Sequence, residues 1–180
     1  GYGHGAQTVA KAALSGGANS LGVATLQEGI ELRKSGLDSP ILLLGNLTDV
    51  NSLSSCFYWD LTPTLSSMRE ALLCQNLAKD SGKKFNVQLK VDTGMSRLGC
   101  DLSDALELFR SINDFDNLHL EGVYSHLALA DGDLDGEGGE VTQLQQERFE
   151  SLISNFIPRK QFLRFHLANS AGTLHNSNLH

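Results

Sequence analysis

The chain has 180 residues, 41% of them hydrophobic and 19% charged, which is ordinary for a globular domain with one sizeable core. Its 21 acidic and 14 basic residues give a net charge of -7, and Lys and Arg form no stripe along the sequence, so we expect no nucleic-acid partner. The aliphatic run 41–44 is far too short to cross a bilayer, and three widely spaced cysteines, Cys56, Cys74 and Cys100, favour a reducing cytoplasm over disulfides or structural zinc.

Helical and strand patterns alternate along the whole chain. In chain order we expect a helix at 6–14, a strand at 20–24, a helix from Thr25 to Gly36, a strand at 41–44, a strand at 57–61, a helix at 67–81, a strand at 85–91, a helix at 102–112, a strand at 118–126, a helix at 142–156 and a strand at 162–167. Two helices begin with capping-box spacing, in which a hydroxyl and a carboxylate three residues apart satisfy free backbone amides: Thr25 with Glu28, and Ser67 with Glu70.

This alternation predicts an α/β fold. Strands separated by helices pair in parallel through right-handed crossovers, which leaves a doubly wound sheet or a β/α barrel. Of these two we expect the barrel, a (β/α)8 TIM-type barrel. Because a complete one takes about 250 residues, it should be incomplete here, with about six of the eight units present. We therefore expect residues 1–180 to form a single partial barrel.

Polar side chains occur where two predicted strands end. Gln88 and Lys90 alternate with apolar neighbours, so one file of that strand should face inward and the other should pack against helices. The loop 92–99 follows, and its Arg97 could hold a carboxylate through two parallel hydrogen bonds. His126 ends the next strand. Barrel enzymes place their chemistry at this end, although a surface arginine and a structural histidine are the alternatives.

Three further motifs lie in predicted turns. Tyr2-Gly3-His4-Gly5 places a phenol and an imidazole on a Gly-rich turn before a helix, and an ordinary turn is the alternative. Residues 166–172 end the last strand with small hydrogen-bonding residues, as a phosphate cradle would, and helix capping by Asn169 or Ser170 is a competing explanation that can hold as well. Residues 131–136 resemble the start of a calcium loop but lack its bidentate Glu, so we expect no metal.

Taken in order, these motifs resemble those of bacterial alanine racemases. The matching elements are Y-G-H-G at 2–5, P-I-L-L-L-G at 40–45, L-K-V-D-T-G-M-S-R-L-G at 89–99, S-H at 125–126 and H-L-A-N-S-A at 166–171. The run at 89–99 is the most specific of them. The resemblance implies an N-terminal barrel that binds pyridoxal 5'-phosphate, a C-terminal β domain that is absent from these residues, and a homodimer.

The resemblance also implies a reaction. Such enzymes interconvert L-alanine and D-alanine by two-base proton transfer on a pyridoxal-phosphate aldimine, and they supply D-alanine for peptidoglycan in the cytoplasm. In the family, the Schiff-base lysine precedes the Y-G-H-G motif and the tyrosine base belongs to the C-terminal domain. We therefore expect no catalytic base within these 180 residues and no racemase activity from them alone.

Individual roles follow from the resemblance residue by residue. Arg97 would bind the substrate carboxylate, and Lys90 matches a lysine that is often carbamylated, a change that makes it an anion able to hold Arg97. Ser96 stands where the family commonly has glycine, and Leu127 stands where an aromatic residue is frequent. The implied cofactor contacts are Tyr2, Leu44, His126, Asn169 and Ser170.

Three other interpretations stay open from the sequence. A racemase of broader amino-acid specificity would share the same barrel. A non-catalytic pyridoxal-phosphate-binding barrel is disfavoured by the Arg97 motif together with the separate Y-G-H-G pattern. A truncated chain without function is the third, because a barrel that lacks strands has open edges that pair with other chains.

Overall fold

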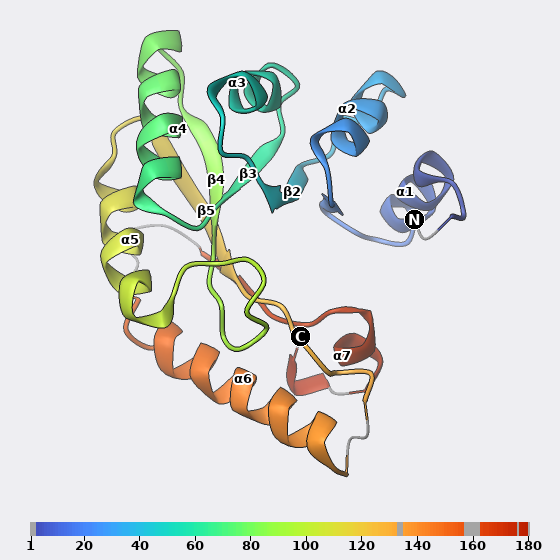
Figure 1. Cartoon of the computed structure of the whole chain (residues 1–180). Helices are drawn as coiled ribbons and strands as arrows, with labels where there is room; N and C mark the ends of the chain where they lie inside the picture. The colour runs from blue at the N-terminus through green and yellow to red at the C-terminus, as the bar shows by residue number, and fades with distance from the viewer. Residues whose placement is uncertain (1–2, 133–134, 157–162, 176, 180) are drawn as a thin grey trace.

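The computed structural model describes residues 3–132, 135–156, 163–175 and 177–179 (Figure 1). The strands are β1 Leu21–Val23, β2 Ile41–Asn46, β3 Thr62–Leu65, β4 Phe85–Lys90, β5 Leu118–Tyr124 and β6 Arg164–His166. The helices are α1 Ala6–Ser15, α2 Leu26–Lys34, α3 Val50–Tyr58, α4 Met68–Ser81, α5 Leu102–Asp114, α6 Glu137–Ile153, α7 Ser170–His175 and the short 3-10 helix η1 Ser177–Leu179.

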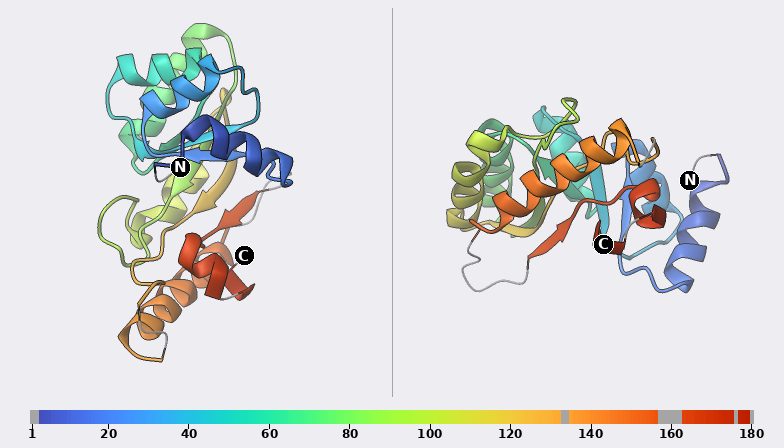
Figure 2. Two further views of the ribbon diagram at one scale, coloured as in Figure 1. Left: turned by 90° about the vertical axis from the view of Figure 1, so that its right-hand side faces the viewer. Right: turned by 90° about the horizontal axis from the view of Figure 1, so that it is seen from below.

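The strands form one parallel sheet in which spatial order equals chain order, from β1 to β6. A doubly wound sheet reverses its strand order at a switch point, whereas a barrel does not. The helices follow the strands as an arc (Figure 1), and Figure 2 shows this arrangement from two further sides. The molecule is therefore an incomplete β/α barrel of six strands, which confirms the predicted fold class.

The two faces of the sheet differ in chemistry, as the alternation along β4 predicted. Val87 and Leu89 are fully buried in the core between the sheet and its helices. Gln88 and Lys90 face the other way, and they are 6% and 5% exposed. A second, smaller apolar cluster joins α1 and α2 to β1 and β2. The concave face encloses a cavity of about 600 Å³ that residues of all six strands line, with apolar side chains such as Leu42 and Phe165 beside the polar Gln88 and His166.

The predicted strand at 57–61 is wrong. Residues 50–58 form α3, because Asp49 caps that helix by accepting a hydrogen bond from the amide of Ser52 at 2.9 Å. Leu53 and Cys56, three residues apart, point into the core from this helix. The real strand, β3, begins only at Thr62. An aromatic run at a helix end had the composition of a strand.

Other element ends shift by smaller amounts. The last predicted strand is only three residues long, Arg164–His166, and α6 starts five residues before the predicted 142. Strand β5 ends at Tyr124, so His126 lies in the loop beyond it. The capping box of Thr25 forms in full. At α4 only half of it forms, because Glu70 accepts from the amide of Ser66 at 2.6 Å instead of reaching Ser67.

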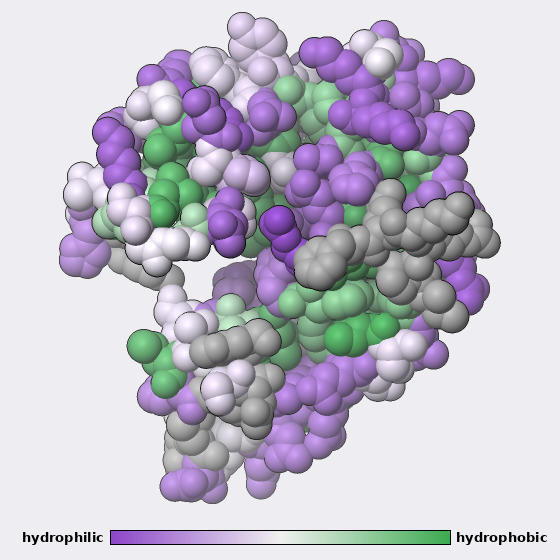
Figure 3. All heavy atoms as spheres, turned by 180° about the vertical axis from the view of Figure 1, so that it is seen from behind, coloured by the Kyte–Doolittle hydropathy of each residue, from purple (hydrophilic) through white to green (hydrophobic). Residues whose placement is uncertain are grey.

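The surface and the cysteines add two observations. From behind, hydrophobic residues reach the surface in a patch below the middle of the molecule (Figure 3). Phe165 of the edge strand β6 is 36% exposed, so this edge is less fully covered than the centre of the sheet.

The three cysteines are buried and free. Across the ranges described above, none of the helices combines the length and apolarity that crossing a bilayer requires.

The close approach of β1 and β2 yields a testable prediction. A Cβ at Gly45 would lie 2.6 Å from the carbonyl oxygen of Ala24, whereas one at Gly22 would meet only the Leu44 side chain at 3.6 Å. We expect Gly45→Ala to lower the free energy of unfolding of the full-length protein by about 1–3 kcal/mol, because the strands must separate. Gly22→Ala should change it by less than about 0.5 kcal/mol. Denaturant titration measures both, and equal losses would contradict the prediction.

Candidate functional site

The candidate site lies at the edge of the sheet where the parallel strands end. Each described residue predicted for it is at or near the C-terminal end of a strand or in the segment that follows: Leu44 in β2, Lys90 at the end of β4, Arg97 after β4, His126 after β5, and Asn169 and Ser170 after β6. The ends of parallel strands share one edge, so these residues gather there. Tyr2 lies outside the described residues.

A polar network crosses the concave face just below this edge. The hydroxyls of Tyr124 and Thr64 are 2.7 Å apart, and Thr64 donates to the carbonyl oxygen of Leu43, also at 2.7 Å. The Tyr124 ring stacks on the His166 ring with centroids 4.8 Å apart. Nε2 of His166 is 2.8 Å from Oε1 of Gln88. Strands β2 to β6 are thus joined by side chains as well as by backbone hydrogen bonds.

This environment holds both rings of the network uncharged at neutral pH. Burial raises the pKa of the Tyr124 hydroxyl to about 12. His166 keeps some exposed surface, but partial burial of its ring, together with the charge of Arg164, holds its pKa below the usual value. A neutral His166 can donate from Nε2 to Gln88, which matches the contact observed.

Above this network, three basic side chains lie close enough to influence one another. Lys90 is almost fully buried, with Nζ 5.4 Å from the centroid of the Tyr124 ring. Burial and the neighbouring Arg97 lower the pKa of Lys90, while Asp92 acts in the opposite direction. Burial lowers the pKa of His126, and Lys90 and Arg97 lower it further. The positive charges of Lys90 and Arg97 favour an anionic ligand, and the neutral ring of His126 lies beside them.

The loop that carries Arg97 is fastened to itself. Oδ1 of Asp92 accepts from the amides of Gly94 and Ser96 at 2.8 and 3.1 Å. Cys100 returns to the strand, and its amide donates to the carbonyl oxygen of Lys90 at 2.9 Å. This return needs glycine at position 99, where φ is +127° and a Cβ would lie 2.6 Å from a backbone nitrogen. The arginine is exposed, but its backbone is closely constrained.

The segment after β6 joins the site through Asn169. Its Nδ2 donates to the carbonyl oxygen of Leu127 at 3.2 Å, next to His126, and its Oδ1 accepts from the amide of Gly172 at 2.9 Å. Asn169 therefore caps α7, as one of the two sequence interpretations expected. Ser170 is exposed at the start of α7, and its hydroxyl has no hydrogen-bond partner in the part of the chain that the structure describes.

Sequence reasoning missed the residues that support this site. Tyr124, Thr64 and Gln145 of α6 are buried polar side chains whose hydrogen bonds link neighbouring strands or loops. The alternation of residues along β5 could have indicated that the Tyr124 side chain points inward. No sequence signal distinguished Gln145 from its exposed neighbours. Over the residues that the structure describes, no three His, Cys, Asp or Glu side chains gather to bind a metal ion.

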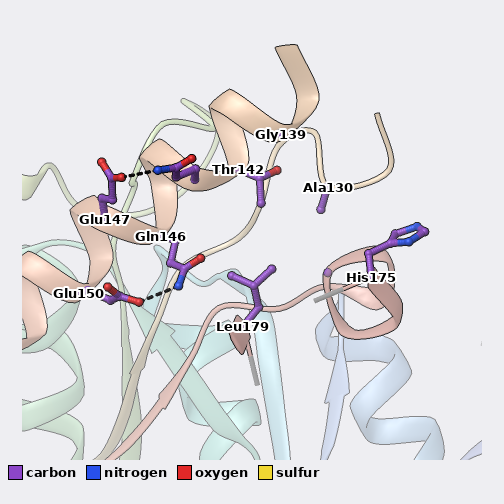
Figure 4. Close-up of a pocket in the computed structure, with 10 residues that line it drawn as sticks. Ala130, Gly139, Thr142, Gln146, Glu147, Glu150, His175 and Leu179 are labelled. Atoms are coloured by element: carbon purple, nitrogen blue, oxygen red, sulfur yellow. Dashed lines mark hydrogen bonds between the residues drawn. The ribbon is translucent and has the colours of Figure 1, made fainter. Parts of the chain in front are cut away.

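A second cavity, of about 510 Å³, lies away from the strand ends, between α6 and the segment of α7 and η1 (Figure 4). Its carboxylates are already engaged, because Gln143 donates to Glu147 at 2.8 Å and Gln146 donates to Glu150 at 2.7 Å. None of the residues predicted for the site lines it. The strand-end cluster is therefore the better candidate.

Comparison with known proteins identifies the family to which the chain is similar. A family model described as alanine racemase, N-terminal domain, matches residues 1–180. The chain is 57% identical to alanine racemase of Prochlorococcus marinus over 100% of the chain and 47% of the relative, and 42% identical to that of Synechocystis over 99% and 47%. A solved alanine racemase of Clostridium difficile 630 superposes with a TM-score of 0.88 at 30% identity, over 99% of this chain and 48% of that one. The chain spans about half the length of the curated relatives it matches.

The strained loop residue provides a stability test. Ser96 has φ of 57°, a left-handed conformation that costs a residue with a Cβ more than it costs glycine. Ser96→Gly should stabilise the protein by about 0.5–1 kcal/mol, after part of the gain is lost to the greater freedom of the unfolded chain. Ser20→Gly, at an exposed loop position without positive φ, should not stabilise it. Thermal melting of both variants measures the change in stability. A lower melting temperature for Ser96→Gly would show that the backbone at position 96 is not strained.

Proposed function

Because the chain belongs to the alanine racemase N-terminal domain family, we propose that it is the barrel half of a pyridoxal-phosphate-dependent isomerase that interconverts L-alanine and D-alanine. Lys90, Arg97 and His126 carry the proposal, because all three lie at or just beyond the strand ends and each of Lys90 and His126 is influenced by the charge of Arg97. An amino-acid carboxylate and a cofactor phosphate are the kind of anions that such a cluster attracts. The remaining half of the enzyme would correspond to the part of the relatives that this chain does not match.

The residues at the strand ends fit pyridoxal 5'-phosphate. Leu44 offers an apolar wall, and half-buried His126 offers a flat ring face. The hydroxyl of Ser170, which has no hydrogen-bond partner among the described residues, lies on a helix that Asn169 caps and offers a donor for a phosphate, and Tyr2 would be a second donor. When bound, the cofactor makes the proton on the substrate Cα easier to remove. The described residues bind and orient, and we propose that the proton-transferring groups lie outside the chain.

In this arrangement Arg97 binds the substrate carboxylate. Its planar guanidinium suits a carboxylate better than an ammonium group would, because two hydrogen bonds form in parallel. The constrained loop backbone sets where that group can reach. The substrate would therefore be held on the side where Lys90 and His126 lie.

We further propose that Lys90 is carbamylated in the enzyme. A buried lysine beside an arginine is an unfavourable pair of like charges, and both influences lower the pKa of Lys90. A lower pKa leaves more of the neutral amine, the form that reacts with carbon dioxide. The resulting carbamate would be an anion next to Arg97, so repulsion would become attraction and the guanidinium would be fixed in place.

The wider setting follows the same proposal. The enzyme would be a cytoplasmic homodimer that supplies D-alanine for peptidoglycan, without a nucleic-acid or membrane partner. The full-length protein should convert L-alanine to D-alanine when pyridoxal phosphate is present, and residues 1–180 alone should not. Chiral chromatography of the product measures this, and absence of D-alanine from the cofactor-loaded full-length protein would refute the proposed function.

Arg97→Lys tests the substrate-binding role. The variant keeps a positive charge but loses the planar fork, so kcat/KM for L-alanine should fall by about tenfold or more, which is about 1.4 kcal/mol for each power of ten. The visible absorbance of bound pyridoxal phosphate should persist, because Arg97 is not assigned to the cofactor. Arg110 is an exposed residue of helix α5 and belongs to none of the strand-end motifs, and Arg110→Lys is the matched control. Loss of cofactor with unchanged turnover per bound cofactor would place Arg97 at the phosphate instead.

A further inference from the structure

Gln145 is an unusual side chain for the inner face of a helix. It belongs to α6, it is 1% exposed, and both atoms of its amide group are used. Oε1 accepts from the amide of Ala128 at 2.8 Å. Nε2 donates to Oγ1 of Thr93 at 3.1 Å and to the carbonyl oxygen of His126 at 3.0 Å. Without these partners, the buried amide would destabilise the folded protein more than an apolar side chain of the same shape would.

These partners belong to two different loops of the candidate site. Thr93 begins the turn that carries Arg97, and its hydroxyl is also 2.8 Å from that of Ser125, the residue before His126. The other two partners are the backbone groups of His126 and Ala128, in the loop after β5. One side chain therefore joins the loop after β4 to the loop after β5.

A second contact from α6 acts on the same loop. Arg148, almost one helical turn beyond Gln145, donates from Nη1 to the carbonyl oxygen of Thr93 at 3.0 Å. The next residue, Gly94, has φ of +143°, and a Cβ there would lie 3.1 Å from Arg148 and 3.5 Å from Gln145. The loop thus rests directly on α6, and glycine permits the approach.

We propose that Gln145 is a positioning residue that sets the spacing between Arg97 and His126 by holding the backbones of their loops. That this spacing matters for catalysis rests on the proposed function. If Arg97 binds the substrate and His126 packs on the cofactor, their separation decides how the substrate meets the cofactor. Gln145 itself touches neither substrate nor cofactor.

Four variants of the full-length holoenzyme isolate this role. Gln145→Met keeps the length of the side chain and removes all three hydrogen bonds. Gln145→Glu keeps the acceptor for Ala128 and removes both donors. Gln143→Met is the surface control on the same helix, where only the bond to Glu147 is lost. Phe149→Leu, on the buried face of α6, is the control for lost stability without loss of the loop contacts.

Hydrogen exchange and steady-state kinetics of these variants test the proposal. Hydrogen exchange of the peptides covering 92–100 and 125–130 reports on the loops without reference to activity, and it should become faster in both Gln145 variants than in either control. KM for L-alanine should rise by about fivefold or more, with a smaller fall in kcat, because substrate binding depends on where Arg97 lies. In Phe149→Leu, at a similar melting temperature, KM should stay within about twofold of the parent.

Unchanged exchange in both peptides would overturn the proposal, whatever the activity. So would faster exchange with a KM no higher than that of Phe149→Leu, because the loops would then be held without consequence for the substrate. A parent enzyme that forms no D-alanine would instead refute the proposed function, and the exchange data alone would then decide whether Gln145 holds the loops.

Discussion

Parallel pairing of each strand with the next one along the chain is the constraint on which the rest of this structure depends. It requires every connection to return by a helix on the outer side, so apolar residues gather between sheet and helices. It also brings every strand's C-terminal end to one edge. Leu44 and Asn169 are far apart in sequence, yet both lie at that edge because the strands that carry or precede them are parallel.

The concave face follows from the same geometry. Side chains that point inward from parallel strands meet one another, and in this chain many are polar, so each must find a partner there. Tyr124, Thr64, Gln88 and His166 do so across four strands, with neutral groups bonded to neutral groups. Lys90 is charged and almost fully buried. Its position beside Arg97 makes a nearby anion favourable for it.

Sequence predicted which residues lie at the strand ends, because motif, strand periodicity and topology all point to the same positions. It failed at 57–61, where Phe57, Tyr58 and Trp59 have the composition of a strand but Asp49 caps a helix whose buried positions are three apart. It could not find Gln145 either. Three glutamines occur at 143, 145 and 146, and only the rotation of α6 about its axis decides which one is buried. That rotation is a tertiary property.

The exposed arginine and the buried glutamine are parts of one solution to an entropic problem. A long flexible side chain on a mobile loop loses both its own freedom and that of the loop when it binds a ligand. Here the loop has already lost its freedom on folding, through Asp92, the return at Gly99 and the contacts with α6. Only the side chain of Arg97 remains to be ordered. The left-handed backbone at Ser96 is part of the free-energy cost of ordering this loop. That cost lowers the folding stability of the domain and does not lower the affinity for the ligand.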